Sequence, residues 1–233
     1  MTDDDWTIPE ITVAVDLAIL TVKAGSLQIM LVKRGIPPFE DELALPGGFL
    51  ESTAEDLDSA AARELTEETG LRAEDLHLEQ LKTYGGLGRD PRGRVVSVCY
   101  VAFTPNLPAP AAGGDAREVI LTPVDDVLRP QVTMAFDHKE IVADAVERAR
   151  NKLEYTTLGA TFCAPEFTIT DLRQVYEIVW GERLDPRNFH RKITSVPGFL
   201  TPTGGRVTRQ AGRPAALYRR GPATILHPAM LRT

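Results

Sequence analysis

Four glutamates and one arginine between residues 55 and 68 have a spacing that could serve metal chemistry. Glu55 precedes the run Arg63-Glu64-Leu65-Thr66-Glu67-Glu68-Thr69-Gly70-Leu71. Carboxylates three or four positions apart meet on one side of a helix, where they can share Mg²⁺ or Mn²⁺ with waters and substrate phosphates. Such a metal would neutralise a diphosphate and activate a water molecule. The same residues could also bind a ligand without cleaving it, or form an ordinary solvated helix face.

The phase of this predicted helix argues against the solvated alternative. At about 100° per residue, Glu64 and Glu68 fall on the same side as the apolar Leu65, whereas Arg63 falls on the solvent side. Burying a carboxylate in the protein interior costs free energy unless the carboxylate is paired or binds metal. Helical phase therefore favours a ligand or metal site, and its candidate groups are Glu64, Glu67 and Glu68.

A second candidate site is the glycine-rich stretch YGGLGRDPRGRVVSV, residues 84–98. Glycines allow a backbone to approach a ligand closely, and arginines bind phosphate oxygens in pairs. Arg89, Asp90, Arg92 and Arg94 could equally belong to a basic surface hairpin. Because the surrounding half of the chain is acidic, three arginines close together favour phosphate binding.

Four further side chains are weaker candidates for the same ligand. Lys33 and Arg34 end a predicted strand and could reach the phosphates, although both could also be exposed charges. Tyr84 or Phe39 could stack on an adenine, and each could equally well be a core residue.

The distribution of charge divides the chain into two halves with different partners. The 233 residues carry a net charge of -7. Residues 1–150 contain 14 Lys and Arg against 27 Asp and Glu, whereas residues 151–233 contain 12 against 6. An acidic half repels phosphates unless a metal intervenes, and a basic half attracts nucleic acid directly. We therefore expect two domains, residues 1–153 and residues 154–233.

Composition indicates a globular protein of the reducing cytoplasm, with no membrane segment. Cys99 and Cys163 are the only cysteines, and their spacing matches neither a CxxC motif nor a structural zinc site. The N-terminus lacks an apolar signal core. The most apolar early run, ITVAVDLAIL, is ten residues long and contains Asp16, so it is too short to span a bilayer.

The N-terminal half has the pattern of an α+β domain. Two β-rich runs flank Ala24-Gly25-Ser26 and predict a hairpin. A loop with Pro46-Gly47-Gly48 leads into a helix near residues 55–69, and Val95–Phe103 is a predicted strand.

A long helix is predicted from Phe136 to Leu153. Asp137, with Glu140 three residues later, resembles a capping box at its N-terminus. Because this helix lies between the two halves, it is the element expected to carry a conformational change from one half to the other.

The C-terminal half has the element order of a winged helix-turn-helix. TITDLRQVYEIVWG predicts a helix that ends at Gly181, and a second helix is predicted from Pro186 to Val196, with Asp185 as its N-cap. The segment GFLTPTGGRVTRQAGRPAALYRR then predicts an arginine-rich hairpin. Helix, turn, helix and basic hairpin is the order found in winged helix domains that bind double-stranded DNA.

The second of these helices separates apolar from basic positions. Phe189, Ile193 and Val196 recur at helical spacing and should face the core. A solvated basic domain, an RNA contact or a protein contact would carry similar charges. The candidates for reading base edges and phosphates are Arg187, Asn188, His190, Arg191 and Lys192 on the helix, with Arg206, Arg209 and Arg213 on the hairpin.

Gly48, Glu55 and RELTEETGL together resemble the Nudix box, whose pattern is G-x5-E-x7-R-E-U-x-E-E-x-G-U with U aliphatic. This box is the signature of hydrolases that cleave nucleoside diphosphates linked to another group. The resemblance implies that the three glutamates of the run hold the metal and that Arg63 pairs with Glu55 to fix the loop. One departure is that six residues, instead of five, separate Gly48 from Glu55.

The whole chain resembles the Nudix-related transcriptional regulators of NAD metabolism (NrtR). The resemblance covers roughly residues 10–220 and rests on the box and on GRDPRGRVVSV, FDHKEI, FTITDLRQVYEIVWG, NFHRKI and GRPAALYR. GRDPRGR is similar to a stretch of Nudix proteins that recognise ADP-ribose. In NFHRKI, His190 stands where the family more often has arginine.

This resemblance implies a Nudix α/β/α sandwich with a mixed sheet, followed by a winged helix-turn-helix. It implies a homodimeric repressor of genes for NAD biosynthesis or salvage, which leaves its DNA operator when ADP-ribose binds the Nudix domain. Because the glutamates of the box are intact, a second possibility is a Mg²⁺-dependent ADP-ribose pyrophosphatase, alone or combined with the repressor.

Overall fold

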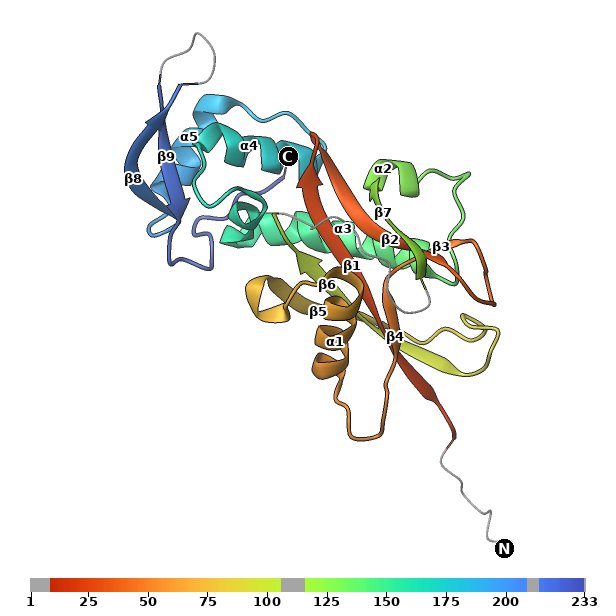
Figure 1. Cartoon of the computed structure of the whole chain (residues 1–233). Coiled ribbons are helices and arrows are strands. Elements are labelled where there is room, and N and C mark those ends of the chain that lie inside the picture. The colour runs from red at the N-terminus through yellow and green to blue at the C-terminus, as the bar shows by residue number, and fades with distance from the viewer. Residues whose placement is uncertain (1–8, 106–115, 209–213, 233) are drawn as a thin grey trace, which may run out of the picture.

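The structure, a computed structural model of the chain, describes residues 9–105, 116–208 and 214–232. A mixed β-sheet forms the N-terminal part and is covered by helices on both faces (Figure 1). A small helical unit with a two-stranded hairpin follows. The predicted fold class, an α/β/α sandwich followed by a winged helix, is confirmed.

Strands β1 (Thr12–Lys23) and β2 (Ser26–Arg34) form the predicted hairpin. Lys23 pairs with Ser26 across the turn. Ala24 and Gly25 both have positive φ, 51° and 79°, as a two-residue turn between twisted strands requires. This tight turn fixes the register of the two central strands.

The remaining strands extend the sheet on both sides of this hairpin. β6 (Val95–Phe103) lies parallel to β1, which makes the sheet mixed. The order is β3-β2-β1-β6-β5, where β3 is Leu43–Ala44 and β5 is His77–Tyr84. β4 (Gly47–Phe49) pairs with β1, and β7 (Ala116–Pro123) pairs with β2.

Alternate residues of β1 pack against helices on opposite faces of the sheet. Val15 and Leu17 pack in one core with Leu65 of helix α1 (Leu57–Thr69). Ala18 and Leu20 belong to a second core with helix α3 (His138–Tyr155). Because successive strand residues point to opposite faces, one strand holds both helical layers of the sandwich.

Two short elements complete the N-terminal part. The 3₁₀ turn η1 (Ala73–Asp75) precedes β5, and helix α2 (Val124–Val127) follows β7. None of the helices described between residues 9 and 232 is long and apolar enough to cross a membrane.

The C-terminal elements follow the predicted order. After the 3₁₀ turn η2 (Thr157–Phe162), helix α4 (Ile169–Trp180) ends at the left-handed Gly181. Helix α5 (Pro186–Ser195) has Asp185 as its N-cap. Strands β8 (Leu200–Val207) and β9 (Ala215–Arg220) then pair as the wing. The helix-turn-helix and its hairpin are therefore confirmed.

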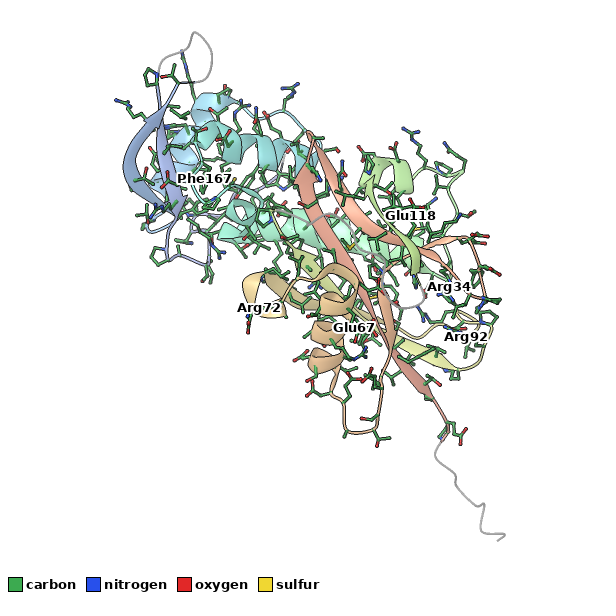
Figure 2. The ribbon with its side chains drawn as sticks, viewed as in Figure 1. Arg34, Glu67, Arg72, Arg92, Glu118 and Phe167 are labelled. Atoms are coloured by element: carbon green, nitrogen blue, oxygen red, sulfur yellow. The ribbon has the colours of Figure 1, made fainter. Side chains whose placement is uncertain are left out.

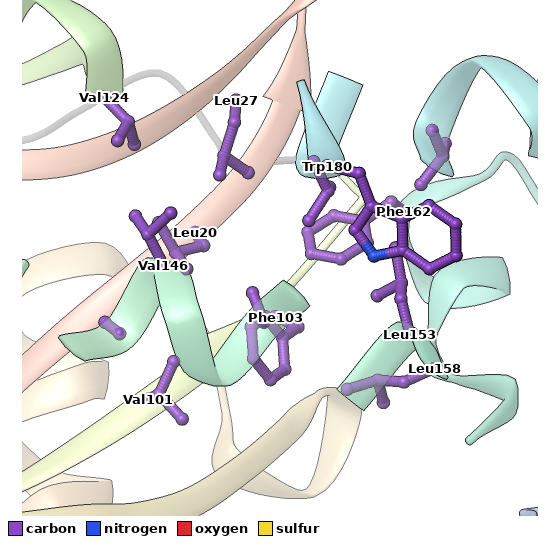
Figure 3. Packing of buried hydrophobic residues seen from close by; sticks show 14 of the residues in the cluster. Leu20, Leu27, Val101, Phe103, Val124, Val146, Leu153, Leu158, Phe162 and Trp180 are labelled. Atoms are coloured by element: carbon purple, nitrogen blue, oxygen red, sulfur yellow. The ribbon is translucent and has the colours of Figure 1, made fainter. Parts of the chain in front are cut away.

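One hydrophobic core continues from the sheet into the winged helix. Figure 3 shows Leu20 of β1 beside Val146 of α3, and Leu153 of α3 near Trp180 of α4, all members of the same buried cluster. Trp180 also donates a hydrogen bond from Nε1 to the carbonyl of Arg150 on α3, at 3.1 Å. The expected domain boundary between residues 153 and 154 falls in the last turn of α3, which belongs to this shared core.

Candidate functional site

A cavity of about 190 Å³ lies where β1, β2 and β4 meet the β5–β6 loop and the start of α3. Figure 2 shows Arg34 and Arg92, both in its lining, on the side of the molecule away from the β8–β9 hairpin. The charged lining residues are Arg34, Arg89, Arg92, Asp16, Glu68 and Asp90, and the aromatic ones are Phe49, Phe136 and His138.

Arg89 is a buried cation in the lining of this cavity. Its Nε and Nη2 atoms donate to the two carboxylate oxygens of Asp137 at 2.8 and 2.6 Å, and Nη2 lies 3.7 Å from Asp16 Oδ2. The side chain is only 6% exposed. Burial alone would lower the pKa of Arg89, but the two carboxylates outweigh burial and raise it. Arg89 is therefore a fixed cation facing the cavity.

Asp16 is a buried acid that the sequence reasoning did not assign to the site. Ser97 Oγ donates to Asp16 Oδ2, and His138 Nε2 lies 3.6 Å from Asp16 Oδ1. The Leu45 amide donates to His138 Nδ1 at 2.9 Å, so the imidazole is neutral with its proton on Nε2. Burial lowers the pKa of His138 and keeps it in this form. An aspartate inside an otherwise apolar strand was the available signal.

Arg92 lies at the aromatic rim. It donates to both oxygens of Asp90, with the shortest distance 2.7 Å from Nη2 to Oδ2. Its guanidinium carbon is 4.8 Å from the centre of the Phe49 ring and 5.4 Å from that of Phe136. Burial would raise the pKa of Asp90, but hydrogen bonds from Arg92 lower it. The rim therefore combines a cation with two apolar rings.

The other cationic candidates divide between the cavity and its surroundings. Arg34 lines the cavity, donates to the Pro38 carbonyl at 2.8 Å and lies 4.9 Å from the Phe136 ring. Lys33 is outside the lining and forms an exposed ion pair with Asp41. Arg94 is also outside the lining and donates to the Gly85 carbonyl at 2.8 Å.

The two aromatic side chains expected at an adenine have different surroundings. Tyr84 is buried in the core beside α3 and donates to Asp144 at 2.7 Å, so the core alternative holds for it. Phe39 packs edge to face on Phe136, with ring centres 4.8 Å apart. Phe136, which the sequence reasoning missed, lines the cavity and has a left-handed backbone with φ 54°.

The glutamates on α1 confirm the predicted helical phase. Glu64 and Glu68 are buried, whereas the Glu67 side chain is 55% exposed. The Arg63 side chain is less exposed than its helical phase predicts, at 20%, because it makes the pairing with Glu55 that the resemblance implies. It donates to Glu55 and to Glu64 at 2.8 Å each and to Glu67 at 3.2 Å.

The pKa values of Glu55 and Glu64 are shifted in opposite directions. Arg63 hydrogen bonds lower the pKa of Glu55. Burial raises the pKa of Glu64, and the neighbouring Arg63 opposes that effect without cancelling it. The Arg63–Glu55 pair ties the loop before α1 to the helix.

Gly48 lies against the Glu64 side chain in spite of the additional residue in the loop. A Cβ atom at Gly48 would lie 2.2 Å from Glu64 Oε1, so only glycine fits without displacing that carboxylate. The exposed residues Ser52, Thr53 and Ala54 belong to the longer loop. The unusual spacing therefore leaves the approach of Gly48 to α1 intact.

The metal prediction has limited support in this geometry. Among the residues that the structure describes, no group of three or more His, Cys, Asp or Glu side chains is arranged to hold a metal ion. Of the three glutamates, only Glu68 lines the cavity, and Arg63 engages the other two. The residue types suit Mg²⁺ or Mn²⁺, so their metal role stays a prediction.

The second candidate surface is the outer face of α5. Phe189, Ile193 and Val196 are buried as predicted. Arg191 Nη2 donates to Asn188 Oδ1 at 2.7 Å, which holds these two side chains together. Arg209 and Arg213 lie outside the described residues. The exposed candidates are Arg187, Asn188, His190 and Arg191 on α5 and Arg206 on β8, and Lys192 is partly buried.

Comparison with known proteins identifies both parts of the chain. Residues 11–145 match the family model of the NUDIX domain, and residues 159–220 match that of the NrtR DNA-binding winged helix domain. The chain is a member of the NrtR family. The ADPR responsive transcriptional repressor NtrR of Acinetobacter baylyi is 34% identical over 213 residues, which are 91% of this chain and 82% of that protein.

Two solved structures of Shewanella oneidensis NrtR agree with this family assignment. The NrtR structure complexed with a 27mer DNA has a TM-score of 0.76 and 33% identity, covering 90% of this chain and 94% of that one. The NUDIX domain of the same protein, complexed with ADP ribose, has a TM-score of 0.55 and 32% identity, covering 64% of this chain and 99% of that one.

Proposed function

We propose that this NrtR-family protein is a transcriptional repressor that responds to ADP-ribose and controls genes of NAD biosynthesis or salvage. The observation that carries the proposal is an arginine-lined cavity in the same chain as an exposed basic helix, α5. The Acinetobacter relative is named for its response to ADP-ribose, and Shewanella NrtR has been crystallised with DNA and, as its NUDIX domain, with ADP ribose. Both comparisons support the proposal.

The cavity has the chemistry of a nucleoside diphosphate site. We assign the diphosphate to Arg89 and Arg92, because guanidinium groups bind phosphate oxygens in pairs. The rings of Phe49 and Phe136 offer apolar faces for the adenine. Arg34 completes the cationic lining, whereas Lys33 and Arg94 make their contacts outside the cavity and are left out of this assignment.

The basic face of α5 has the chemistry of a DNA-reading helix. Arginine and asparagine can each form paired hydrogen bonds with base edges, and the remaining cations suit phosphates. Two copies of α5 in a homodimer would read two half-sites one helical turn apart. Light scattering should then give twice the 25.5 kDa of one chain.

Fluorescence anisotropy with DNA from the protein's own upstream region tests the repressor function. We expect binding that weakens steeply as salt rises, and a further loss of affinity when ADP-ribose is added. Arg191→Ala should weaken DNA binding by about tenfold and reduce the salt slope by about one. Arg129→Ala, which removes an exposed arginine of the N-terminal part, is the charge-matched control.

Two results would contradict the proposal separately. DNA binding that is absent at low salt, or insensitive to salt, would exclude a DNA-binding repressor. Specific DNA binding that ADP-ribose leaves unchanged would exclude the response to this ligand.

A second function, hydrolysis of ADP-ribose, is favoured by the intact glutamates and by the Arg63–Glu55 pair beside Gly48. With Mg²⁺ or Mn²⁺ present, the products should be AMP and ribose 5-phosphate. Glu68→Gln should abolish this activity, and Glu74→Gln, at an exposed glutamate outside α1, should leave it unchanged. AMP formation that survives in Glu68→Gln would refute the assigned metal and catalytic role.

A further inference from the structure

The longest helix, α3, lacks a cap that the other long helices have. Asp56, Thr168 and Asp185 cap α1, α4 and α5, and each side chain accepts a hydrogen bond from the amide three residues later. Asp137 occupies the same position on α3, and its carboxylate makes no capping bond. The capping box expected from the sequence is therefore absent, although a suitable residue is in place.

Arg89 holds the Asp137 carboxylate away from the helix, and the Glu140 amide donates instead to the Asp137 carbonyl at 3.0 Å. Both carboxylate oxygens of Asp137 accept hydrogen bonds from Arg89, at 2.8 and 2.6 Å. Arg89 also lines the cavity, where a diphosphate would offer it the same paired acceptors. Asp137 and a bound diphosphate would then compete for one guanidinium group.

The residue before the cap is held in a strained conformation. Phe136 has φ 54°, which is unfavourable for an aromatic residue. Its ring contacts Arg34 and Arg92 of the cavity lining and Phe39 outside it, so residues of the cavity contribute to holding this backbone. A ligand that changes those contacts therefore acts directly on the first turn of α3.

The far part of α3 is joined to the winged helix by specific bonds. Arg150 Nε donates to the Val179 carbonyl at 3.0 Å, and Trp180 Nε1 donates to the Arg150 carbonyl at 3.1 Å. Leu153 is fully buried in the shared core. A change in the position of α3 therefore also changes the position of α4.

We propose that Asp137 is an exchangeable cap that couples the cavity to DNA binding. Without ligand, Arg89 holds Asp137 away from the helix. When a diphosphate pairs with Arg89, the Asp137 carboxylate turns to accept from the backbone amide of Lys139, because the Glu140 amide already donates to the Asp137 carbonyl at 3.0 Å. The first turn of α3 then changes position. Because α3 is hydrogen-bonded to α4, this shift lowers the DNA affinity of the winged helix. This inference rests on the proposed response to ADP-ribose.

Two substitutions separate the two roles of Asp137. Asp137→Ala removes both the pairing with Arg89 and the cap, whereas Asp137→Asn weakens the pairing and keeps a strong capping residue. Both variants should bind ADP-ribose about tenfold more tightly, because a charged competitor for Arg89 is gone. Asp137→Ala should keep its DNA affinity when ADP-ribose binds. Asp137→Asn should bind DNA weakly even without ADP-ribose.

The experiment measures ADP-ribose binding by calorimetry and DNA binding by anisotropy on the full chain. Asp144→Asn, which removes an acid from the middle of α3, is the matched control and should respond to ADP-ribose as the wild type does. Amide hydrogen exchange tests the cap directly: ADP-ribose should slow exchange at the amide of residue 139 in the wild type and not in Asp137→Ala.

The outcomes distinguish this inference from the function on which it rests. If ADP-ribose does not release DNA from the wild type, the proposed function fails and the coupling fails with it. If the wild type responds and both Asp137 variants release DNA by the same factor, the exchangeable cap is refuted and the repressor function stands.

Discussion

Glu79 on β5 anchors α3 to the sheet. Replacing Glu79 by glutamine should measure how much this anchor contributes to the free energy of unfolding. Glu79 accepts from Arg148 at 3.0 Å and lies 2.6 Å from Lys152 Nζ, and both cations belong to α3. His77 Nε2 lies 2.8 Å from Glu79 Oε2, the same oxygen that Lys152 approaches. Burial would raise the pKa of Glu79, but these three partners lower it from 4.5 to about 2.

The magnitude follows from this pKa difference. One pKa unit corresponds to about 1.4 kcal/mol, so the shift bounds the stabilisation at about 3 kcal/mol. Because Glu79 retains some contact with water, we expect Glu79→Gln to lower the free energy of unfolding by about 2 kcal/mol at pH 7. The folded pKa lies below the unfolded one. The stabilisation is therefore complete above about pH 5 and disappears as the pH falls towards 2.

Urea unfolding of wild type and Glu79→Gln between pH 7 and pH 3 provides the assay. The difference between the two proteins should be constant from pH 7 to pH 5 and then shrink. Glu74→Gln, at a side chain that is 67% exposed, should unfold like the wild type throughout. A difference that is absent at pH 7, or that stays constant down to pH 3, would refute the anchoring role.

Three further substitutions test other contacts by their effects on unfolding and ligand binding. Gly47→Ala should destabilise the protein by about 3 kcal/mol in a urea titration, because its Cβ would lie 2.2 Å from the backbone oxygen of Val15. Trp180→Phe removes the hydrogen bond to the Arg150 carbonyl and should cost about 1–2 kcal/mol in the same assay. Tyr84→Phe should lower stability by about 1 kcal/mol and leave ADP-ribose affinity unchanged in calorimetry, because the ring lies in the core. Weaker ADP-ribose binding by Tyr84→Phe would contradict this placement.

The features that the sequence predicted correctly are those encoded by local periodicity. Phe189 and Ile193 are buried while Arg191 between them is exposed, as an amphipathic helix requires. Glu64 and Glu68 are buried because their phase on α1 coincides with that of its apolar residues. Strands such as β3 and β4 were missed because two or three residues carry no periodic signal.

The arrangement of the cavity could not be predicted, because it depends on contacts between distant segments. Asp137 has the pattern of an N-cap, yet a residue 48 positions earlier, Arg89, takes its carboxylate. Asp16 gains its polar surroundings only when β1 pairs with β6 and brings Ser97 beside it. Residue types indicated a phosphate site, but the partners of each charge were set by the tertiary fold.

The core shared by the sheet and the winged helix has a consequence for the lifetime of the protein. Because Leu20 and Trp180 belong to one buried cluster, neither half can open without exposing surface of the other. A ligand at 100 times its dissociation constant stabilises the state that binds it by about 2.7 kcal/mol. Occupying the cavity therefore protects α4 and α5 from proteases as well. Ligand levels would then set how much of the protein accumulates in addition to how much of it binds DNA.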